Sequence, residues 1–393
     1  MRLFPQVRHM EHQSQARPTV AEIDGRALAD NFAELARIAG GRGVVLPVVK
    51  SDAYGHGLAR VARILYGAGA ERFAVATAAE GEVLRAAGLN AAVVVLGGVY
   101  PAEHERVVAA RLTPVVWDAD GVRALAASAR AAGRVVPVHV KVDTGMSRLG
   151  IVPEDAPALL RALADVDGIT VEGLLTHFAN AESVDDASVR RQLADFERLV
   201  ATLADAHLRP PIVHAANSAA TLTTPRARFD AVRPGLALYG IHPSPGSRGA
   251  ASLKPAMRFV TRIVALRRIA PGVAVSYGGT FVARRPSTIA TVPVGYADGY
   301  PRALSNRGEV VVRGARAPIA GRVCMDQTMI DVTDVADAAV GDEVVLWGGA
   351  LPVEDVAARA ETISYELIAR VGARVPRVLA GEEEIWHGSR ERS

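Results

Sequence analysis

Cysteine is almost absent from the sequence: Cys324 is the single one among 393 residues. One cysteine cannot form a disulfide within the chain, so the fold has to be stable without one, and a reducing compartment suits such a chain. Long apolar runs are absent too, because no stretch reaches the length needed to span a bilayer. Residues 1–18 lack the apolar core of a signal peptide. We therefore expect a cytoplasmic protein without membrane spans, with residues 1–18 as an N-terminal extension.

An excess of either charge is also missing. The 45 basic residues are balanced by 42 acidic ones, which gives a net charge of +3. No basic run is long enough to follow a phosphate backbone. Histidine, cysteine and acidic residues do not cluster at the spacing of metal ligands. We expect neither a nucleic-acid partner nor a metal site.

What the sequence does contain is a regular alternation of short β-branched runs and helical segments. The runs lie at residues 44–49, 73–76, 92–96, 114–117, 135–142, 169–176, 212–215 and 231–239. Helical periodicity occupies residues 24–39, 58–65, 80–87, 103–110, 121–132, 155–164 and 188–206. Eight such strand–helix units favour a closed (β/α)8 barrel of the TIM type. An open, doubly wound sheet is the alternative.

The pattern changes at the turn-prone stretch PSPGS, residues 243–247. Beyond it, strand runs follow one another without helices, at residues 260–269, 275–282, 288–294, 309–312, 329–332 and 343–347. One helical segment, 353–367, lies among them. This order predicts a barrel domain over residues 19–245 and a mainly antiparallel β domain over residues 246–393.

The run VVKSDAYGHG, residues 48–57, places Lys50 at the end of the first expected strand. Burial disfavours an ammonium group and lowers its pKa, which suits Schiff-base or general-base chemistry. The alternative is a lysine whose stem covers apolar surface while its charge stays in water. The residues alone leave both interpretations open.

Other polar side chains fall at the same ends of later strands, where barrel active sites lie. They are Lys141, Arg148, His177, His214 and Arg233. The loops after strands seven and eight offer Asn217, Ser218, Gly235 and Leu236, and barrels often bind phosphate there. For Ser218 the alternative is a helix cap. A phosphate site facing a lysine suggests pyridoxal 5′-phosphate, with a Schiff-base aldolase as the competing interpretation.

A series of motifs then identifies a family resemblance. Besides residues 48–57, they are KVDTGMSRLG at 141–150, THFA at 176–179, HAANSAA at 214–220, VRPGLALYG at 232–240, VSYGGTF at 275–281, VGYADGY at 294–300, VCMDQ at 323–327 and ISYEL at 363–367. In this order the motifs resemble those of bacterial alanine racemases, pyridoxal-phosphate enzymes built from a barrel and a β domain. The resemblance extends over nearly the whole chain.

The resemblance implies roles for individual residues. Lys50 would hold the cofactor as a Schiff base (aldimine) and act as the base for D-alanine, while Tyr277 of the partner subunit would act for L-alanine. Cofactor contacts are implied for Tyr54, His177, Asn217, Ser218, Arg233, Gly235, Leu236 and Tyr365. Substrate-side roles are implied for Arg148, Tyr296, Met325 and Asp326. Lys141 matches a position that is carbamylated in some members.

The resemblance therefore implies a homodimer with shared active sites that interconverts L- and D-alanine and supplies D-alanine for peptidoglycan. Arg233 would contact the pyridine nitrogen, and because arginine only donates hydrogen bonds, it would leave the ring a weaker electron sink. The alternatives are a serine or broad-specificity racemase, a decarboxylase on the same fold, and a barrel-only protein of pyridoxal-phosphate homeostasis. Against the last two stand the Tyr277 motif and the long β domain.

Overall fold

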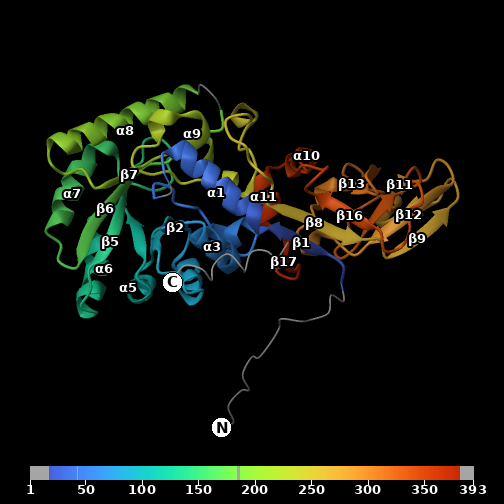
Figure 1. Ribbon diagram of the computed structural model, residues 1–393, viewed down its shortest axis with the longest axis horizontal. Coiled ribbons are helices and arrows are strands. Elements are labelled where there is room, and N and C mark those ends of the chain that lie inside the picture. The colour runs from blue at the N-terminus through green and yellow to red at the C-terminus, as the bar shows by residue number, and fades with distance from the viewer. Residues whose placement is uncertain (1–16, 42, 184–185, 381–393) are drawn as a thin grey trace, which may run out of the picture. The chain divides into compact units, whose positions relative to one another are not determined.

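The computed structural model describes residues 17–41, 43–183 and 186–380 (Figure 1). They form two compact units. One consists of the chain up to Glu22 together with Arg258–Val378, and the other consists mainly of Ile23–Met257. We call them the β unit and the barrel unit. The sequence pattern predicts a boundary after residue 245, whereas the units change between Met257 and Arg258. The expected extension, residues 1–18, lies almost wholly outside the described residues.

The barrel unit is built on six hydrogen-bonded parallel strands (Figure 1). In spatial order they are β2 (Arg72–Val75), β3 (Ala92–Val95), β4 (Thr113–Val116), β5 (Val136–Lys141), β6 (Ile169–Leu175) and β7 (Ile212–His214). Isolated parallel bridges join Val48 to Ala74, Val45 to Val232, and His214 to Ala231. Two further extended segments therefore link β7 back to β2 and close a ring of eight. The predicted (β/α)8 barrel is confirmed.

Helices alternate with these strands. They are α1 (Gly25–Ala39), α3 (Leu58–Gly67), α4 (Ala78–Ala86), α5 (His104–Ala109), α6 (Ala119–Ala131), α7 (Ala156–Ala164), α8 (Ala187–Asp205) and α9 (Ser218–Thr223). The short element α2 (Lys50–Tyr54) has left-handed backbone angles and is a turn. The helix α1 shows why they form: the Asp24 side chain accepts the Ala27 N–H as an N-cap, and Leu28, Phe32 and Leu35 are fully buried at helical spacing. The cap and the apolar stripe thus agree on where this helix begins and which face it buries.

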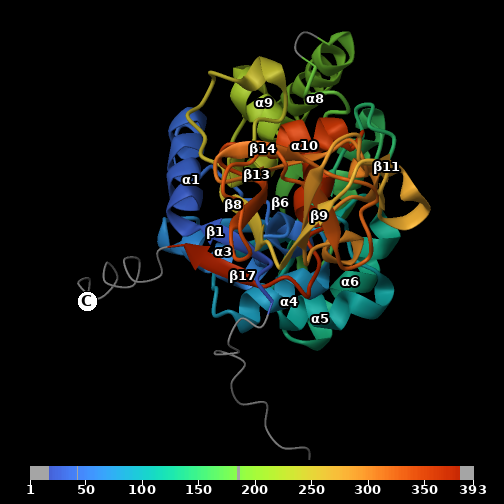
Figure 2. The same cartoon turned by 90° about the vertical axis from the view of Figure 1, so that its right-hand side faces the viewer.

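The β unit contains a six-stranded sheet, seen end-on in Figure 2, and a smaller sheet of three strands. The larger has the order β14 (Ala315–Pro318), β13 (Glu309–Val312), β16 (Glu343–Trp347), β8 (Met257–Arg262), β1 (Val20–Asp24) and β17 (Arg377–Ala380). The smaller has the order β15 (Thr328–Asp331), β12 (Ser287–Val292) and β9 (Ala265–Ile269), and β10 (Ala274–Val275) pairs with β11 (Phe281–Val282). The helices α10 (Val353–Arg359) and α11 (Ser364–Ala369) complete it.

Three expected strands differ in the structure. Residues 260–269 form β8 and β9 in different sheets, because the Ile263 N–H donates to Asp342 O at 3.0 Å while the next N–H, of Val264, donates to Thr291 O at 2.9 Å. Residues 231–239 do not continue as a strand: after Pro234 the chain turns into the short 3-10 helix η4 (Leu236–Tyr239). Residues 275–282 form two short strands, β10 and β11, which are separated by a 3-10 helix and pair with each other. Each of the three breaks interrupts a run that the sequence pattern predicts as one strand.

The described residues also contain strands that the sequence pattern did not indicate, namely β1, β14 and β17. Within the same residues, no helix is both long and apolar enough to cross a bilayer. For example, α8 has 19 residues but carries charged side chains such as Arg190 and Asp195. Within the described residues, no group of three or more histidine, cysteine or acidic side chains is placed to hold a metal ion.

Candidate active site

Lys50 lies at the rim of the barrel, directly after the first extended segment. The four residues that follow it, Ser51, Asp52, Ala53 and Tyr54, all have φ between 53° and 55°. This left-handed conformation costs a residue other than glycine about 1–2 kcal/mol. It is supported by the Ser51 N–H, which donates to Glu80 at 2.6 Å, and by Asp52, which accepts the Leu58 N–H at 2.7 Å. Strain of this kind typically gathers at functional sites.

Cationic side chains surround Lys50. Burial lowers the pKa of Lys50, and the positive charge of Arg148 acts in the same direction, against Glu80. Lys141 is only 5% exposed. Burial lowers the pKa of Lys141 to about 8, again with help from Arg148. Both amines are therefore shifted toward the neutral, nucleophilic form.

The loop that carries Arg148 is organised by one carboxylate. Asp143 accepts the backbone N–H groups of Gly145, Met146 and Ser147 at 2.8–3.1 Å. Ser147 has a φ of 54°, a turn that these bonds support. Asp143 thereby fixes the backbone next to Arg148 without forming an ion pair with it.

The loops after β7 and the eighth segment form a cradle of small polar groups. The Ser218 hydroxyl accepts the N–H of Gly235 at 2.9 Å and of Ala237 at 3.2 Å, which leaves its own hydrogen to be donated. Gly235 is required here, since a Cβ would come within 2.2 Å of the Tyr54 hydroxyl. Ser218 is not the helix cap, so that alternative is wrong: Asn217 caps α9 by accepting the Ala220 N–H at 3.0 Å. Leu236 follows at the start of η4.

Arg233 lies buried beside this cradle. Its guanidinium donates to His214 Nδ1 at 2.7 Å, to the carbonyls of Thr176 and Ala215 at 2.7 and 3.0 Å, and to His177 Nδ1 at 3.4 Å. Burial lowers the pKa of Arg233 to about 9, which still leaves it charged at neutral pH. Burial also lowers the pKa of His177 to about 3, and Arg233 adds to this effect. His177 is therefore a neutral ring beside a fixed cation.

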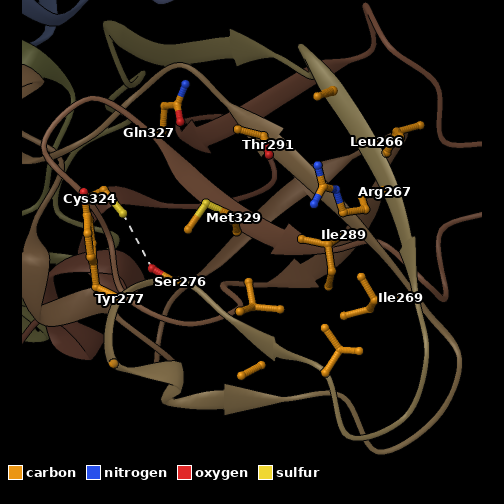
Figure 3. Close-up of a pocket in the computed structure, with 15 residues that line it drawn as sticks. Leu266, Arg267, Ile269, Ser276, Tyr277, Ile289, Thr291, Cys324, Gln327 and Met329 are labelled. Atoms are coloured by element: carbon orange, nitrogen blue, oxygen red, sulfur yellow. Dashed lines mark hydrogen bonds between the residues drawn. The ribbon is translucent and has the colours of Figure 1, made fainter.

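The remaining predicted residues belong to the β unit. Tyr277 begins the 3-10 helix η6 (Tyr277–Gly279), and its side chain is 73% exposed. It lies at one side of a pocket of about 830 Å³, next to Ser276 and Cys324 and across from Leu266 (Figure 3). The Ser276 hydroxyl donates to Arg322 O at 2.8 Å. The Tyr277 phenol is thus exposed, while the backbone next to it is held in place by the Ser276 hydrogen bond.

Tyr296, Met325 and Asp326 are held together as one piece of the β unit. The Tyr296 N–H donates to Cys324 O and the Ala297 N–H to Met325 O, both at 3.0 Å. Arg374 bridges Asp326 to the buried carboxylate of Asp298, at 2.7 Å to each. The structure therefore brings these three residues together.

The predicted residues fall into two groups. The barrel unit holds Lys50, Tyr54, Lys141, Arg148, His177, Asn217, Ser218, Arg233, Gly235 and Leu236. The β unit holds Tyr277, Tyr296, Met325, Asp326 and, in α11, Tyr365. Sequence reasoning missed three residues that extend the Arg233 group, namely His139, Glu172 and Arg72. The available signal for His139 and Glu172 was their polarity within expected strand runs of an otherwise apolar barrel, whereas Arg72 directly precedes such a run.

These features define a barrel enzyme whose rim combines an amine of lowered pKa, a buried guanidinium–imidazole group and a hydroxyl–glycine cradle. Comparison with known proteins places it within that class. Residues 23–243 match the family model "Alanine racemase, N-terminal domain", and residues 256–379 match "Alanine racemase, C-terminal domain". The chain belongs to the alanine racemase family.

Individual relatives agree with this assignment. An alanine racemase of Halothermothrix orenii is 45% identical over 92% of this chain and 96% of its own length. The crystal structure of alanine racemase from D-cycloserine-producing Streptomyces lavendulae superposes with a TM-score of 0.88, at 37% identity, over 94% of this chain and 98% of that one. The alanine racemase of Bartonella henselae, crystallised with covalently bound pyridoxal phosphate, superposes with a TM-score of 0.84, at 33% identity, over 92% of this chain and 99% of that one.

Proposed function

We propose that this chain is an alanine racemase that uses pyridoxal 5′-phosphate to interconvert L- and D-alanine. One observation carries the proposal: a half-buried lysine of lowered pKa, Lys50, shares the barrel unit with the Ser218–Gly235 cradle and with buried Arg233. The family membership and the names of the relatives support the same activity. The D-alanine made would then be available for peptidoglycan synthesis.

The residues of the barrel unit fit this cofactor. The Ser218 hydroxyl, the side-chain-free Gly235 and the Tyr54 hydroxyl form a small polar cradle that would hold the phosphate group. Arg233 can donate to a pyridine nitrogen, and His177 supplies a neutral ring for stacking. When bound, the cofactor supplies a carbonyl that condenses with an amine and a ring that withdraws electrons from the amino acid.

Racemisation requires a proton to leave one face of the α-carbon and another to arrive at the opposite face. We assign the two positions to Lys50 Nζ and to the Tyr277 hydroxyl, because each can both accept and donate a proton. Burial and Arg148 favour the neutral amine of Lys50, which is the form that accepts a proton. Arg148 would hold the substrate carboxylate.

Lys50 and Tyr277 belong to different units of the chain. We propose that the Tyr277 that serves a given Lys50 comes from the partner subunit of a homodimer, as the family resemblance implies. Tyr296, Met325, Asp326 and Tyr365 would accompany it. The 73% exposure of the Tyr277 side chain within one chain is consistent with a phenol that acts on another molecule.

Lys141 is proposed to be carbamylated. Burial and the charge of Arg148 lower its pKa to about 8, so a neutral amine is accessible near neutral pH. That amine can add to CO2, forming an N–C bond and releasing one proton. The product is an anion, and it would neutralise a neighbouring guanidinium rather than repel it.

The test of this function is a racemase assay with the purified full-length protein and pyridoxal phosphate, using L-alanine, L-serine and further amino acids. We expect a visible absorbance band from bound cofactor and conversion of L-alanine to D-alanine. Lys50→Met should abolish both, whereas Lys254→Met, at an exposed lysine paired with Asp30, should change neither. Faster conversion of serine than alanine would favour the alternative, a serine or broad-specificity racemase, and no conversion of any amino acid would refute the proposal.

A further inference from the structure

A series of hydrogen-bonded side chains extends from Arg233 through the interior of the barrel unit. His214 Nδ1 lies 2.7 Å from the Arg233 guanidinium, and His214 Nε2 lies 2.8 Å from His139 Nδ1. His139 Nε2 lies 3.3 Å from Glu172, which accepts from Arg72 at 2.9 Å. His139, His214 and Arg233 are at most 4% exposed. These hydrogen bonds therefore link the Glu172 carboxylate, in the middle of β6, to the Arg233 guanidinium.

The donors and acceptors in this series allow one proton arrangement. Arginine only donates, so His214 Nδ1 must accept and its proton must be on Nε2. That proton is then donated to His139 Nδ1, which puts the His139 proton on Nε2, facing the Glu172 carboxylate. Each bond polarises the next, which strengthens all of them in a site of low polarity.

The charge states agree with this arrangement. The hydrogen bond from His139 lowers the pKa of Glu172 to about 2, against burial and with help from Arg72. Burial lowers the pKa of both His139 and His214, so both rings are neutral. At neutral pH the series thus consists of a charged carboxylate, two neutral imidazoles and a charged guanidinium.

A β-bulge in β6 makes this series of hydrogen bonds possible. Val138 pairs with Val171 and the next residue, His139, pairs with Gly173, so Glu172 is the extra residue of a β-bulge. A bulge re-aims the side chain that it carries. The following residue has no room for a side chain, because a Cβ on Gly173 would lie 2.6 Å from the His139 ring. The bulge and the glycine together let Glu172 and His139 meet inside the barrel.

We propose that Glu172 and His139 are positioning residues for Arg233: acting through His214, they fix the tautomer that accepts from the guanidinium and so hold it toward the pyridine nitrogen of the cofactor. The assignment of the cofactor ring rests on the proposed function above. The positions of the protons on His139 and His214 follow from contacts within the protein and do not depend on the cofactor. Without the carboxylate, the two imidazoles lose the acceptor that orients them, and His214 can present an N–H to Arg233, which cannot accept it.

The experiment is 15N NMR of the full-length protein labelled at histidine, with and without added pyridoxal phosphate. Ring-nitrogen shifts distinguish the two neutral tautomers and the imidazolium. We expect His139 and His214 to be neutral and protonated at Nε2 in both samples. His139→Gln and His214→Gln assign the two signals among the 10 histidines of the sequence.

Two variants disturb this series of hydrogen bonds in different ways. Glu172→Leu removes the acceptor that faces His139, whereas glutamine would keep one in its carbonyl oxygen. Gly173→Ala keeps every titratable group but displaces the His139 ring. Both should turn the single His214 tautomer into a mixture and shift the absorbance of bound cofactor. Both should also lower kcat about 10-fold with little change in KM, the usual scale for removing an orienting partner.

Glu82→Leu is the matched control, since Glu82 pairs with Arg106 on the surface of the same unit. It should leave the histidine signals, the cofactor spectrum and kcat unchanged. His214 protonated at Nδ1 in the parent protein would overturn the proposal, as would a Glu172→Leu protein with unaltered tautomers and kcat. If the parent protein fails to racemise alanine but shows the Nε2 tautomers and their loss in Glu172→Leu, only the proposed function fails.

Discussion

Lys141 shows how neighbouring groups set the chemistry of a single residue. It is buried near Arg148 and Arg233, and these surroundings lower its pKa from 10.5 to about 8. A base whose pKa is lowered on folding makes the folded state less stable at every pH where it is still charged. The penalty is complete below about pH 8 and disappears as the pH rises toward 10.5, because the unfolded chain then holds a proton that the folded one has lost.

This predicts the pH dependence of a Lys141→Met protein. In CO2-free buffer and without cofactor, urea unfolding should show the variant to be more stable than the parent at about pH 7, with the difference shrinking toward pH 10. The exposed Lys254→Met change is the control, and its effect should not vary in this way. A Lys141→Met advantage that stays constant or grows with pH would contradict the burial of a charged amine.

At the scale of elements, the turn after Lys50 is the clearest source of strain. Ser51 is exposed and has a φ of 55°, which glycine adopts at no steric cost. We predict that Ser51→Gly raises the free energy of unfolding by about 1 kcal/mol, while Ser51→Val, which is β-branched, lowers it. The bond from the residue 51 N–H to Glu80 does not involve the side chain and should survive. Equal stability of the glycine and valine variants, measured by urea unfolding, would show that the turn is not left-handed.

The cradle formed by α9 and η4 leads to a steric prediction. Gly235→Ala would push a methyl group to within 2.2 Å of the Tyr54 hydroxyl. We expect the dissociation constant for pyridoxal phosphate, measured by absorbance titration, to rise about 10- to 100-fold. Gly67→Ala is the control, since nothing lies within 4 Å of its added Cβ. If both variants bind the cofactor like the parent, the cradle is not the phosphate site.

The sequence predicted these elements well where the periodicity was regular. The helix α1 begins one residue after its expected start, and β13 and β16 occupy the expected residues. It failed where a choice between partners decides the structure. The local sequence does not indicate that residues 263 and 264 hydrogen-bond to two different sheets. The strands β1 and β17 form only because they pair with residues far away in the sequence.

The candidate site was predictable to the same extent. Motifs place Lys50, Ser218 and Arg233 at strand ends, and the barrel topology brings them into one unit. The interior link through His139 and Glu172 was not predictable, because it depends on a bulge that shifts the register of β6 by one residue. Side-chain direction within a strand cannot be known before its register is.

For the whole molecule, the proposed dimer makes one strong prediction. Mixing two inactive proteins, Lys50→Ala and Tyr277→Phe, after unfolding and refolding them together should restore about a quarter of the parent activity. About half of the dimers are then mixed, and one of the two shared sites in each combines an intact Lys50 with an intact Tyr277. No recovery, with mixed dimers shown to be present by differential tagging, would mean that each site is built within one chain.

Proton exchange by Lys50 and Tyr277 can be followed with L-alanine in D2O, the protein and pyridoxal phosphate. We expect D-alanine that carries deuterium at the α-carbon, because the returning proton comes from a group that exchanges with solvent. Tyr277→Phe should still bind the cofactor but form D-alanine at least about 100-fold more slowly, the scale of losing one general acid–base group. L-Alanine that keeps both its α-hydrogen and its configuration in the presence of the cofactor-loaded parent protein would contradict the account.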